Sequence, residues 1–212
     1  MTRVASREAP QVLVRTGKSR GAQSRVIRII GGTLRGRRLR FPDVPEIRPT
    51  PDRVRETLFN WLAPRLVGAR CLDLFAGSGA LGLEALSRGA ASAVFVEQSA
   101  AATRALSELI AEWNAHGARI ERADAVKFLQ GSAQPFEIVF LDPPFAAGVL
   151  SSAATLLEER GWLAPEALIY VESSARAALP ALPPSWQPLK AKQAGEVGYH
   201  LFARVARGAE PE

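Results

Sequence analysis

Two short segments carry the residues best suited to chemistry, and each follows an apolar, strand-like stretch. The first is Asp73-Leu74-Phe75-Ala76-Gly77-Ser78-Gly79, whose glycines let the backbone turn tightly and approach a ligand. The second is Asp142-Pro143-Pro144-Phe145, where two prolines fix φ and remove two N–H donors. The carbonyls of this second segment are therefore free acceptors in a stiff loop.

The second segment suits a planar base that carries an exocyclic amine. We expect the amine N–H groups to bond Asp142 and the Pro143 carbonyl, with Phe145 stacked on the ring. Such bonds turn the nitrogen lone pair toward an electrophile. The simpler alternative is a turn that only ends a strand. We take Asp142, Pro143, Pro144 and Phe145 as the candidate catalytic set.

The glycine segment leaves the nature of its ligand open. Gly77, Gly79 and Gly82 match G-x-G-x-x-G, and Glu97 follows at the distance of a ribose-binding acid in dinucleotide enzymes. Asp73 would repel a pyrophosphate, however, and favours a cation such as the amine and sulfonium of S-adenosylmethionine. We expect Glu97 to bind ribose hydroxyls, and Asp124 to lie near an adenine amino group. A turn that merely packs a helix on a strand is the third alternative.

Strand-like and helix-like stretches alternate around these segments, which predicts βαβ units and a parallel sheet covered on both faces. Thr50 is the expected N-cap of the first helix, Pro51 its first residue, and Pro64 its end. We predict strands at 71–75, 93–96, 119–122, 136–141, 168–172 and 197–205, and helices at 80–87, 100–114, 125–129 and 150–159.

Composition excludes several classes of protein. The chain has 212 residues, 47% of them hydrophobic and 23% charged, as in ordinary globular proteins. Its single cysteine, Cys71, rules out an intrachain disulfide framework, and two histidines leave little for a histidine metal site, so we expect no metal. No segment has the length of an apolar membrane span or the apolar core of a secretory signal. A cytoplasmic protein is expected.

Positive charge is concentrated at the N-terminus. Residues 1–55 hold fourteen basic and four acidic residues, a net charge of +10, whereas the remainder carries −4. This asymmetry favours a polyanionic partner over a merely solvated tail. We expect a basic, mobile extension at 1–24 and a β-hairpin within 25–47, ahead of a larger domain at 48–208. The hairpin arginines are Arg25, Arg28, Arg35, Arg37, Arg38 and Arg40.

Several blocks, in the same order, resemble the RsmD family of 16S ribosomal RNA guanine-N2 methyltransferases. They are R-I-I-G-G-T-L-R-G-R-x-L, R-P-T-P-D-R-V-R-E-T-L-F-N-W-L, L-D-L-F-A-G-S-G-A-L-G-L-E-A-L-S-R-G-A and F-L-D-P-P-F. The resemblance covers about residues 25–204. Pro51 departs from the Thr or Ser often found there, and the last strand, often G-x-V-x-Y-x-L in the family, here reads G-E-V-G-Y-H-L over residues 195–201.

The resemblance implies a Rossmann-like class I methyltransferase fold with a mostly parallel seven-stranded sheet. It implies S-adenosylmethionine as donor, no metal, and a monomer that acts on 16S rRNA within the small subunit or its assembly intermediate. The hairpin arginines would grip RNA phosphates. The block around residue 50 would cap the donor, with Arg53 able to meet a carboxylate. The implied donor-binding residues are Asp73, Phe75, Gly77, Ser78, Gly79, Glu97, Asp124, Arg48, Thr50 and Arg53.

Three alternatives stay open at this point. A DNA methyltransferase, or one acting on another RNA, would share the Asp142–Phe145 chemistry, although only about 45 residues precede the first helix and leave no room for a large DNA-recognition domain. A dinucleotide-dependent oxidoreductase would share the glycine loop. A non-catalytic RNA-binding module would share the basic hairpin.

Overall fold

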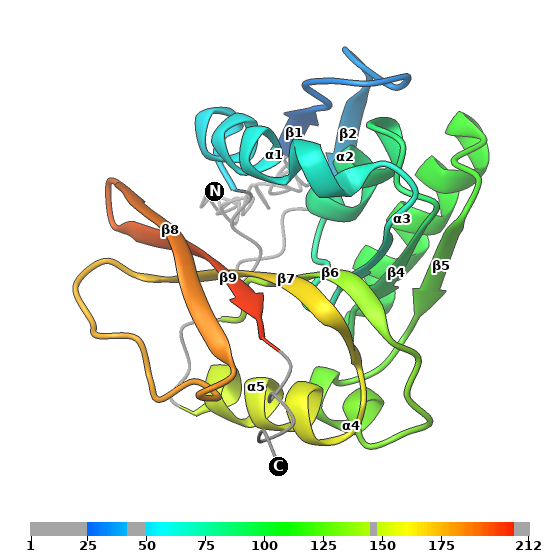
Figure 1. Cartoon of the computed structure of the whole chain (residues 1–212). Coiled ribbons are helices and arrows are strands. Elements are labelled where there is room, and N and C mark those ends of the chain that lie inside the picture. The colour runs from blue at the N-terminus through cyan, green and yellow to red at the C-terminus, as the bar shows by residue number, and fades with distance from the viewer. Residues whose placement is uncertain (1–24, 42–49, 145–147, 206–212) are drawn as a thin grey trace, which may run out of the picture.

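The computed structural model describes residues 25–41, 50–144 and 148–205, and its centre is a seven-stranded sheet (Figure 1). The strand order is β5-β4-β3-β6-β7-β9-β8. Neighbours from β5 to β7 pair in parallel, and β9 and β8 pair antiparallel at one side. The predicted mostly parallel sheet is thus confirmed. The strands are β3 Arg70–Asp73, β4 Ser92–Val96, β5 Ala118–Glu121, β6 Phe136–Leu141, β7 Leu163–Ser174, β8 Trp186–Ala194 and β9 Val197–Arg204.

Helices cover both faces of the sheet, as the continuous apolar character of the central strands requires. In Figure 1, α1, α2 and α3 lie on one face, and α4 and α5 lie on the other. Each face of the sheet has its own hydrophobic core, and alternate side chains of β6 point into each. Phe140 packs with the first group of helices, and Leu141 packs with the second. The helices are α1 Asp52–Leu66, α2 Ala80–Ser87, α3 Ala100–Trp113, α4 Ala125–Leu129 and α5 Val149–Glu159.

The order of the strands reverses between β3 and β6. The chain runs outward from β3 through β4 to β5, then crosses back to place β6 on the other side of β3. Ligands of open α/β sheets bind beyond the carboxyl ends of the strands at such a reversal. The glycine segment follows β3, and the Asp-Pro-Pro segment follows β6. The fold therefore brings the two candidate segments to one place.

The predicted N-terminal hairpin is present as a separate antiparallel pair, β1 Arg25–Arg28 and β2 Arg38–Phe41. It is docked on the body of the protein, since Ile27, Leu39 and Phe41 are buried in the core that α1 and α2 share. Its connecting turn touches the end of α2. A Cβ on Gly32 would lie 1.8 Å from the Ser87 carbonyl oxygen, and Gly32 has φ +76°, so glycine is required there.

The predictions for the first helix were wrong at both ends. Thr50 does not cap α1, because Pro51 occupies the N-cap position and the Thr50 hydroxyl bonds a distant side chain instead. Pro64 does not end the helix, which continues to Leu66. The carbonyl that Pro64 cannot bond belongs to Asn60, an exposed residue, so water can satisfy it.

Other elements also differ from expectation. The strand predicted at 168–172 extends over Leu163–Ser174, and the helix predicted at 100–114 ends at Trp113, with Asn114 as its left-handed C-cap residue. The strand β8 was missed altogether. Its side chains are nearly all exposed because it forms the sheet edge, so it lacks the alternation that predicts a half-buried strand.

Two kinds of feature are absent from the described residues. No helix among them is both long and apolar enough to cross a membrane. The same residues hold no group of three or more His, Cys, Asp or Glu side chains placed to bind a metal ion. Cys71 lies in the core with no exposed surface, as expected of an apolar strand residue.

Candidate active site

The glycine segment forms a tight turn between β3 and α2. Gly79 is the N-cap residue of α2 and has φ +76°, a conformation that side chains other than hydrogen rarely allow. A Cβ at this position would also come within 2.5 Å of the Leu106 side chain of α3. The Ala76 N–H donates to the Val96 carbonyl, which ties the turn to the end of β4. The loop is therefore held at the sheet edge by packing and by backbone bonds.

Asp73 is the last residue of β3 and is almost completely buried. Its Oδ2 accepts a hydrogen bond of 3.0 Å from the Gly82 N–H in the first turn of α2. Burial raises the pKa of Asp73 to about 7, and the nearby Glu97 and Glu172 carboxylates add to the rise. A cationic ligand would reverse this effect by favouring the ionised carboxylate.

Glu97 joins the glycine loop to α3. Its Oε2 accepts from the Gly77 N–H at 2.9 Å, and its Oε1 accepts from the Ser99 N–H at 2.7 Å. A carboxylate oxygen has a second lone pair, so Glu97 can also accept from ribose hydroxyls. Asp124 is exposed and is the N-cap of α4, where its Oδ1 accepts from the Lys127 N–H. The two acids follow the neighbouring strands β4 and β5.

Asp142 and Pro143 follow β6 directly, and Pro143 is buried whereas Asp142 is half-buried. No side chain or backbone group of the described residues bonds the Asp142 carboxyl. Burial raises the pKa of Asp142 well above its ordinary value, and the charges of Glu172 and Asp73 raise it further. Phe145, the fourth residue of the candidate catalytic set, lies outside the described residues, as do Arg48 and residues 1–24.

Glu172 is a site residue that the sequence analysis did not single out. It lies on β7, where the pairing of Leu141 with Val171 places it one position further, level with Asp142. Its Oε1 accepts from the Thr50 hydroxyl and from the Tyr170 hydroxyl, each at 2.8 Å. The available signal was an acid at the end of the strongly apolar strand Leu168–Val171, but strand-terminal acids are too common to indicate a site alone.

Three acids, here called the acidic edge, lie toward the carboxyl ends of three neighbouring parallel strands: Asp73 and Glu172, which are buried, and the half-buried Asp142. Alternation along the strands turns all three toward the face that α1, α2 and α3 cover. No lysine or arginine among the described residues pairs with any of them. Buried acids without cations raise one another's pKa, and a ligand that brings positive charge relieves the cost. The edge therefore fits a cationic ligand and opposes a pyrophosphate.

The expected donor cap is only partly described. Thr50 is buried and reaches Glu172, so it joins the acidic edge rather than the helix N-terminus. Arg53 is exposed on the first turn of α1. Trp61 of the same helix stacks on Tyr199 of β9 with ring centroids 5.5 Å apart, which fixes α1 over this part of the sheet.

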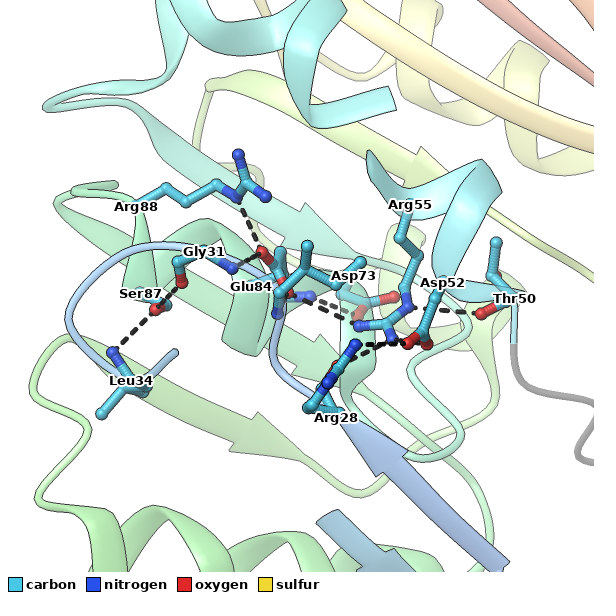
Figure 2. A network of polar contacts seen from close by, with 12 residues as sticks. Arg28, Gly31, Leu34, Thr50, Asp52, Arg55, Asp73, Glu84, Ser87 and Arg88 are labelled. Atoms are coloured by element: carbon cyan, nitrogen blue, oxygen red, sulfur yellow. Dashed lines mark hydrogen bonds and ion pairs between the residues drawn. The ribbon is translucent and has the colours of Figure 1, made fainter. Parts of the chain in front are cut away.

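A second buried charge cluster lies under the hairpin and has the opposite character (Figure 2). This anchor cluster consists of Asp52, Arg55, Glu84 and Arg88. Arg55 and Glu84 have no exposed side-chain surface, and their closest atoms are 3.5 Å apart. Glu84 also accepts from the Ile30 and Gly31 N–H groups, each at 2.8 Å, and from Arg88.

Arg55 completes the anchor cluster by holding three separate segments. It donates to the Arg28 carbonyl of β1 at 2.8 Å, to the Thr50 carbonyl at 3.3 Å and to Asp52 at 2.6 Å. Figure 2 shows these bonds meeting between the hairpin, α1 and α2. The anchor cluster thus fixes the hairpin to α2, the helix that follows the glycine loop, and to Thr50, the residue that contacts Glu172.

Three of the hairpin arginines, Arg28, Arg38 and Arg40, lie on the exposed face of the β1–β2 pair. Arg38 and Arg40 of β2 are exposed, alternating with the buried Leu39 and Phe41, and Arg28 faces Arg38 across the pair. Arg35 is exposed in the turn, and the Arg37 guanidinium lies 5.7 Å from the ring centroid of Trp113. Like charges facing one another across strands are unfavourable unless an anion lies between them. Arg28 also approaches Asp52 at 3.8 Å, and the Arg25 side chain lies outside the described part of the structure.

The chain is similar to known proteins in sequence. The family model described as "Conserved hypothetical protein 95" matches residues 27–203. A curated relative from Escherichia coli K12, ribosomal RNA small subunit methyltransferase D, is 54% identical over 182 residues, which cover 86% of this chain and 92% of the relative.

Solved structures agree with these matches. A protein of E. coli described as the putative methyltransferase yhhF has a TM-score of 0.81 and 53% identity, with 86% of this chain and 99% of that chain covered. A T. thermophilus 16S rRNA N2 methyltransferase, solved with AdoMet and guanosine, has a TM-score of 0.61 and 25% identity. That match covers 87% of this chain and 50% of the other.

Proposed function

The chain belongs to the family that includes ribosomal RNA small subunit methyltransferase D, and from this premise we propose that it methylates the exocyclic N2 of a guanine in 16S rRNA. S-adenosylmethionine is the methyl donor. The observation that carries the proposal is the acidic edge: the glycine loop and the Asp142-Pro143 segment meet where the strand order reverses, beside acids that pair with no lysine or arginine of the described residues. The T. thermophilus neighbour, an N2 methyltransferase solved with guanosine, supports the choice of base.

The residues of the glycine loop and its neighbours would hold the donor. Asp73 supplies a buried carboxylate to positive charge, and Glu97 supplies acceptors for ribose hydroxyls. Phe75, Gly77, Ser78 and Gly79 shape the turn, with Asp124 toward the adenine side and Arg48, Thr50 and Arg53 as the cap. A pyrophosphate would meet the Asp73 carboxylate at the same place, so a dinucleotide-dependent oxidoreductase is disfavoured.

The donor supplies an electrophilic methyl group on a sulfonium, which leaves as S-adenosylhomocysteine. Asp142 accepts an N–H of the guanine amine, and the Pro143 carbonyl accepts the other, so that the nitrogen lone pair turns toward the methyl carbon. The stiff Asp142–Pro144 backbone fixes these acceptors, and Phe145 stacks on the base. As the N–C bond forms and the C–S bond breaks, the nitrogen loses one proton. The raised pKa of Asp142 suits it to accept that proton.

The hairpin would hold the RNA. Its exposed Arg35, Arg38 and Arg40 offer charge to phosphates, while the anchor cluster keeps the hairpin fixed relative to α2. We propose that the enzyme acts as a monomer in the cytoplasm, on the small subunit or an assembly intermediate. The target guanine must be unstacked, or already lie in a loop, for N2 to reach Asp142.

The decisive experiment uses labelled S-adenosylmethionine and small ribosomal subunits from cells that lack this protein. We expect N2-methylguanosine after nucleoside analysis with the wild-type protein and none with Asp142→Ala, which should still bind the donor. Mapping of the modified position then identifies the nucleotide. Transfer to no subunit, despite donor binding, would move the substrate to another RNA, to DNA or to an earlier assembly particle.

A second experiment tests the hairpin as the RNA contact. The triple variant Arg35→Gln, Arg38→Gln, Arg40→Gln should bind RNA more weakly. A plot of its log affinity against log salt concentration should be less steep, with a slope smaller in magnitude by about 2–3. A matched triple variant at Arg65, Arg104 and Arg119, exposed arginines outside the hairpin, should keep the wild-type slope. Equal slopes in the two triple variants would remove the hairpin from the RNA interface.

A further inference from the structure

Glu172 occupies a place in the proposed site that the methyl-transfer chemistry leaves without a role. It stands level with Asp142 on the neighbouring strand, and its side chain points to the same face of the sheet. Neighbouring strands lie about 4.8 Å apart, so the backbones that carry these two carboxyl groups are separated by about that distance. Only 4% of Glu172 is exposed, which is unusual for an acid without a cationic partner.

Two hydroxyl groups fix the Glu172 carboxylate in one orientation. Thr50 and Tyr170 both donate to Oε1, and among the described residues Oε2 has no donor. One carboxylate oxygen is therefore held by two hydroxyl groups, whereas the other accepts no hydrogen bond from the described residues.

We propose that Glu172 reads the N1–H of the target guanine and thereby selects guanine over adenine. The inference rests on the proposed function, because it concerns the base whose N2 faces Asp142. Guanine presents N1–H and the N2 amine side by side, two adjacent donors that match acceptors on adjacent strands. Adenine presents a lone pair at N1, which would face the Glu172 carboxylate and be repelled. Glu172 is accordingly a specificity-determining residue rather than the group that positions the reacting amine.

The two hydroxyl donors also keep Glu172 in the state that can accept N1–H. Burial raises the pKa of Glu172, but the hydrogen bonds from Thr50 and Tyr170 oppose that rise by stabilising the carboxylate. Asp142 has no such donors among the described residues, and Glu172 raises its pKa further. Of these two neighbouring acids, the donors therefore favour the ionised carboxylate on Glu172, and Asp142 is the one more readily protonated.

The test replaces the target guanine by 2-aminopurine, which keeps the 2-amine but has an unprotonated N1. The modified RNA is made by splinted ligation at the mapped position and assembled with small-subunit proteins, alongside a guanine control. We expect the wild-type enzyme to prefer guanine by roughly 10³-fold or more in kcat/KM, since a site built for an N–H rejects an analogue without it. Equal rates on both bases would overturn the role of Glu172, whatever the variants show.

The variant Glu172→Gln should then shift the preference between bases. Thr50 and Tyr170 would hold the amide oxygen in place of Oε1, which turns the amide N–H₂ toward N1 of 2-aminopurine. We expect a fall of about 100-fold in kcat/KM on guanine and a fall of at least about 100-fold in the guanine preference. A purely structural role would lower activity on both bases by the same factor and leave the ratio unchanged, which would contradict the proposal.

A matched control is Glu158→Gln. Glu158 is also a partly buried glutamate with several hydrogen bonds, but it lies on α5, on the other face of the sheet, where it binds Arg204 and Trp186. Its base preference should equal that of the wild type. Failure of the two proposals can be told apart, because the wild-type guanine arm tests methyl transfer itself. If guanine is not methylated at N2, both are overturned; if it is methylated without base preference, only the role of Glu172 is.

Discussion

The acidic edge and the anchor cluster are two buried charge clusters on the same side of the sheet, yet they are built in opposite ways. In the anchor cluster, each carboxylate oxygen of Glu84 accepts from a hairpin N–H and from an arginine. In the acidic edge, Asp73 has one backbone N–H donor and Asp142 has none among the described residues. The paired charges of the anchor cluster join three segments of the chain. The acids of the acidic edge remain able to bind a ligand. Burial alone therefore does not distinguish a structural cluster from a functional one, whereas pairing does.

The sharpest test of this contrast is Asp142→Asn, because it should separate activity from stability. We expect methyl transfer to fall by about 10³-fold, since the amide cannot take the amine proton. Stability should stay unchanged or rise, because the change removes a half-buried acid whose ionisation is already unfavourable. Transfer rates and denaturant unfolding of the same preparation give both values. An active variant, or one that unfolds readily, would place Asp142 with the structural charges.

Glu84→Ala should show the reverse pattern, with the largest loss of stability. Removing it takes away the buried counter-charge of Arg55, leaves only the exposed Asp52 to pair with that guanidinium, and frees two hairpin N–H groups. We expect a loss of about 3–5 kcal/mol in the free energy of unfolding, measured by denaturant titration. Glu108→Ala, at an exposed position of α3, is the control and should change stability by less than about 0.5 kcal/mol. Similar losses in both variants would mean that the anchor cluster contributes little.

The pH dependence of stability should reveal Asp73. Its pKa is about 7 in the folded protein and about 3.9 when unfolded, so the folded state binds more protons between these values. Stability contributed by Asp73 is therefore present at low pH and is lost as pH rises toward 7. Relative to Asp73→Asn, the wild type should lose about 2–3 kcal/mol between pH 5 and pH 8. Unfolding titrations at the two pH values measure this; parallel curves for the two proteins would show an unshifted Asp73.

The smallest effect on stability is expected for an exposed ion pair that, like the anchor cluster, joins an arginine to a glutamate. Arg70 and Glu137 join β3 to β6 through several hydrogen bonds, but both side chains are at least one-third exposed. Glu137→Gln should cost less than about 1 kcal/mol in thermal or denaturant unfolding, because water competes for both charges. A loss as large as that of Glu84→Ala would mean that burial is not what sets the strength of these pairs.

Much of the fold follows from local signals in the chain. The helices at 80–87 and 125–129 and the strand at 136–141 lie where apolar spacing and turn residues predict them. Errors occur where a tertiary contact replaces a local one. Thr50 has the side chain of an N-cap, but Glu172, 122 residues away, takes its hydroxyl bond. The strand β8 is defined by its pairing with β9 and carries almost no burial pattern.

The sequence by itself determined the two candidate segments, the basic N-terminal region and the alternation of strands and helices. Each of these depends only on residues that are close together in the chain. Only the tertiary structure decided that Asp73, Asp142 and Glu172 lie together near the carboxyl ends of adjacent strands, since strand order and register depend on pairings between segments far apart in the chain. It also decided which buried acids pair with cations and which have no cationic partner among the described residues. That difference in pairing, rather than any motif, distinguishes the acids proposed to meet the donor and the base from those that hold the hairpin in place.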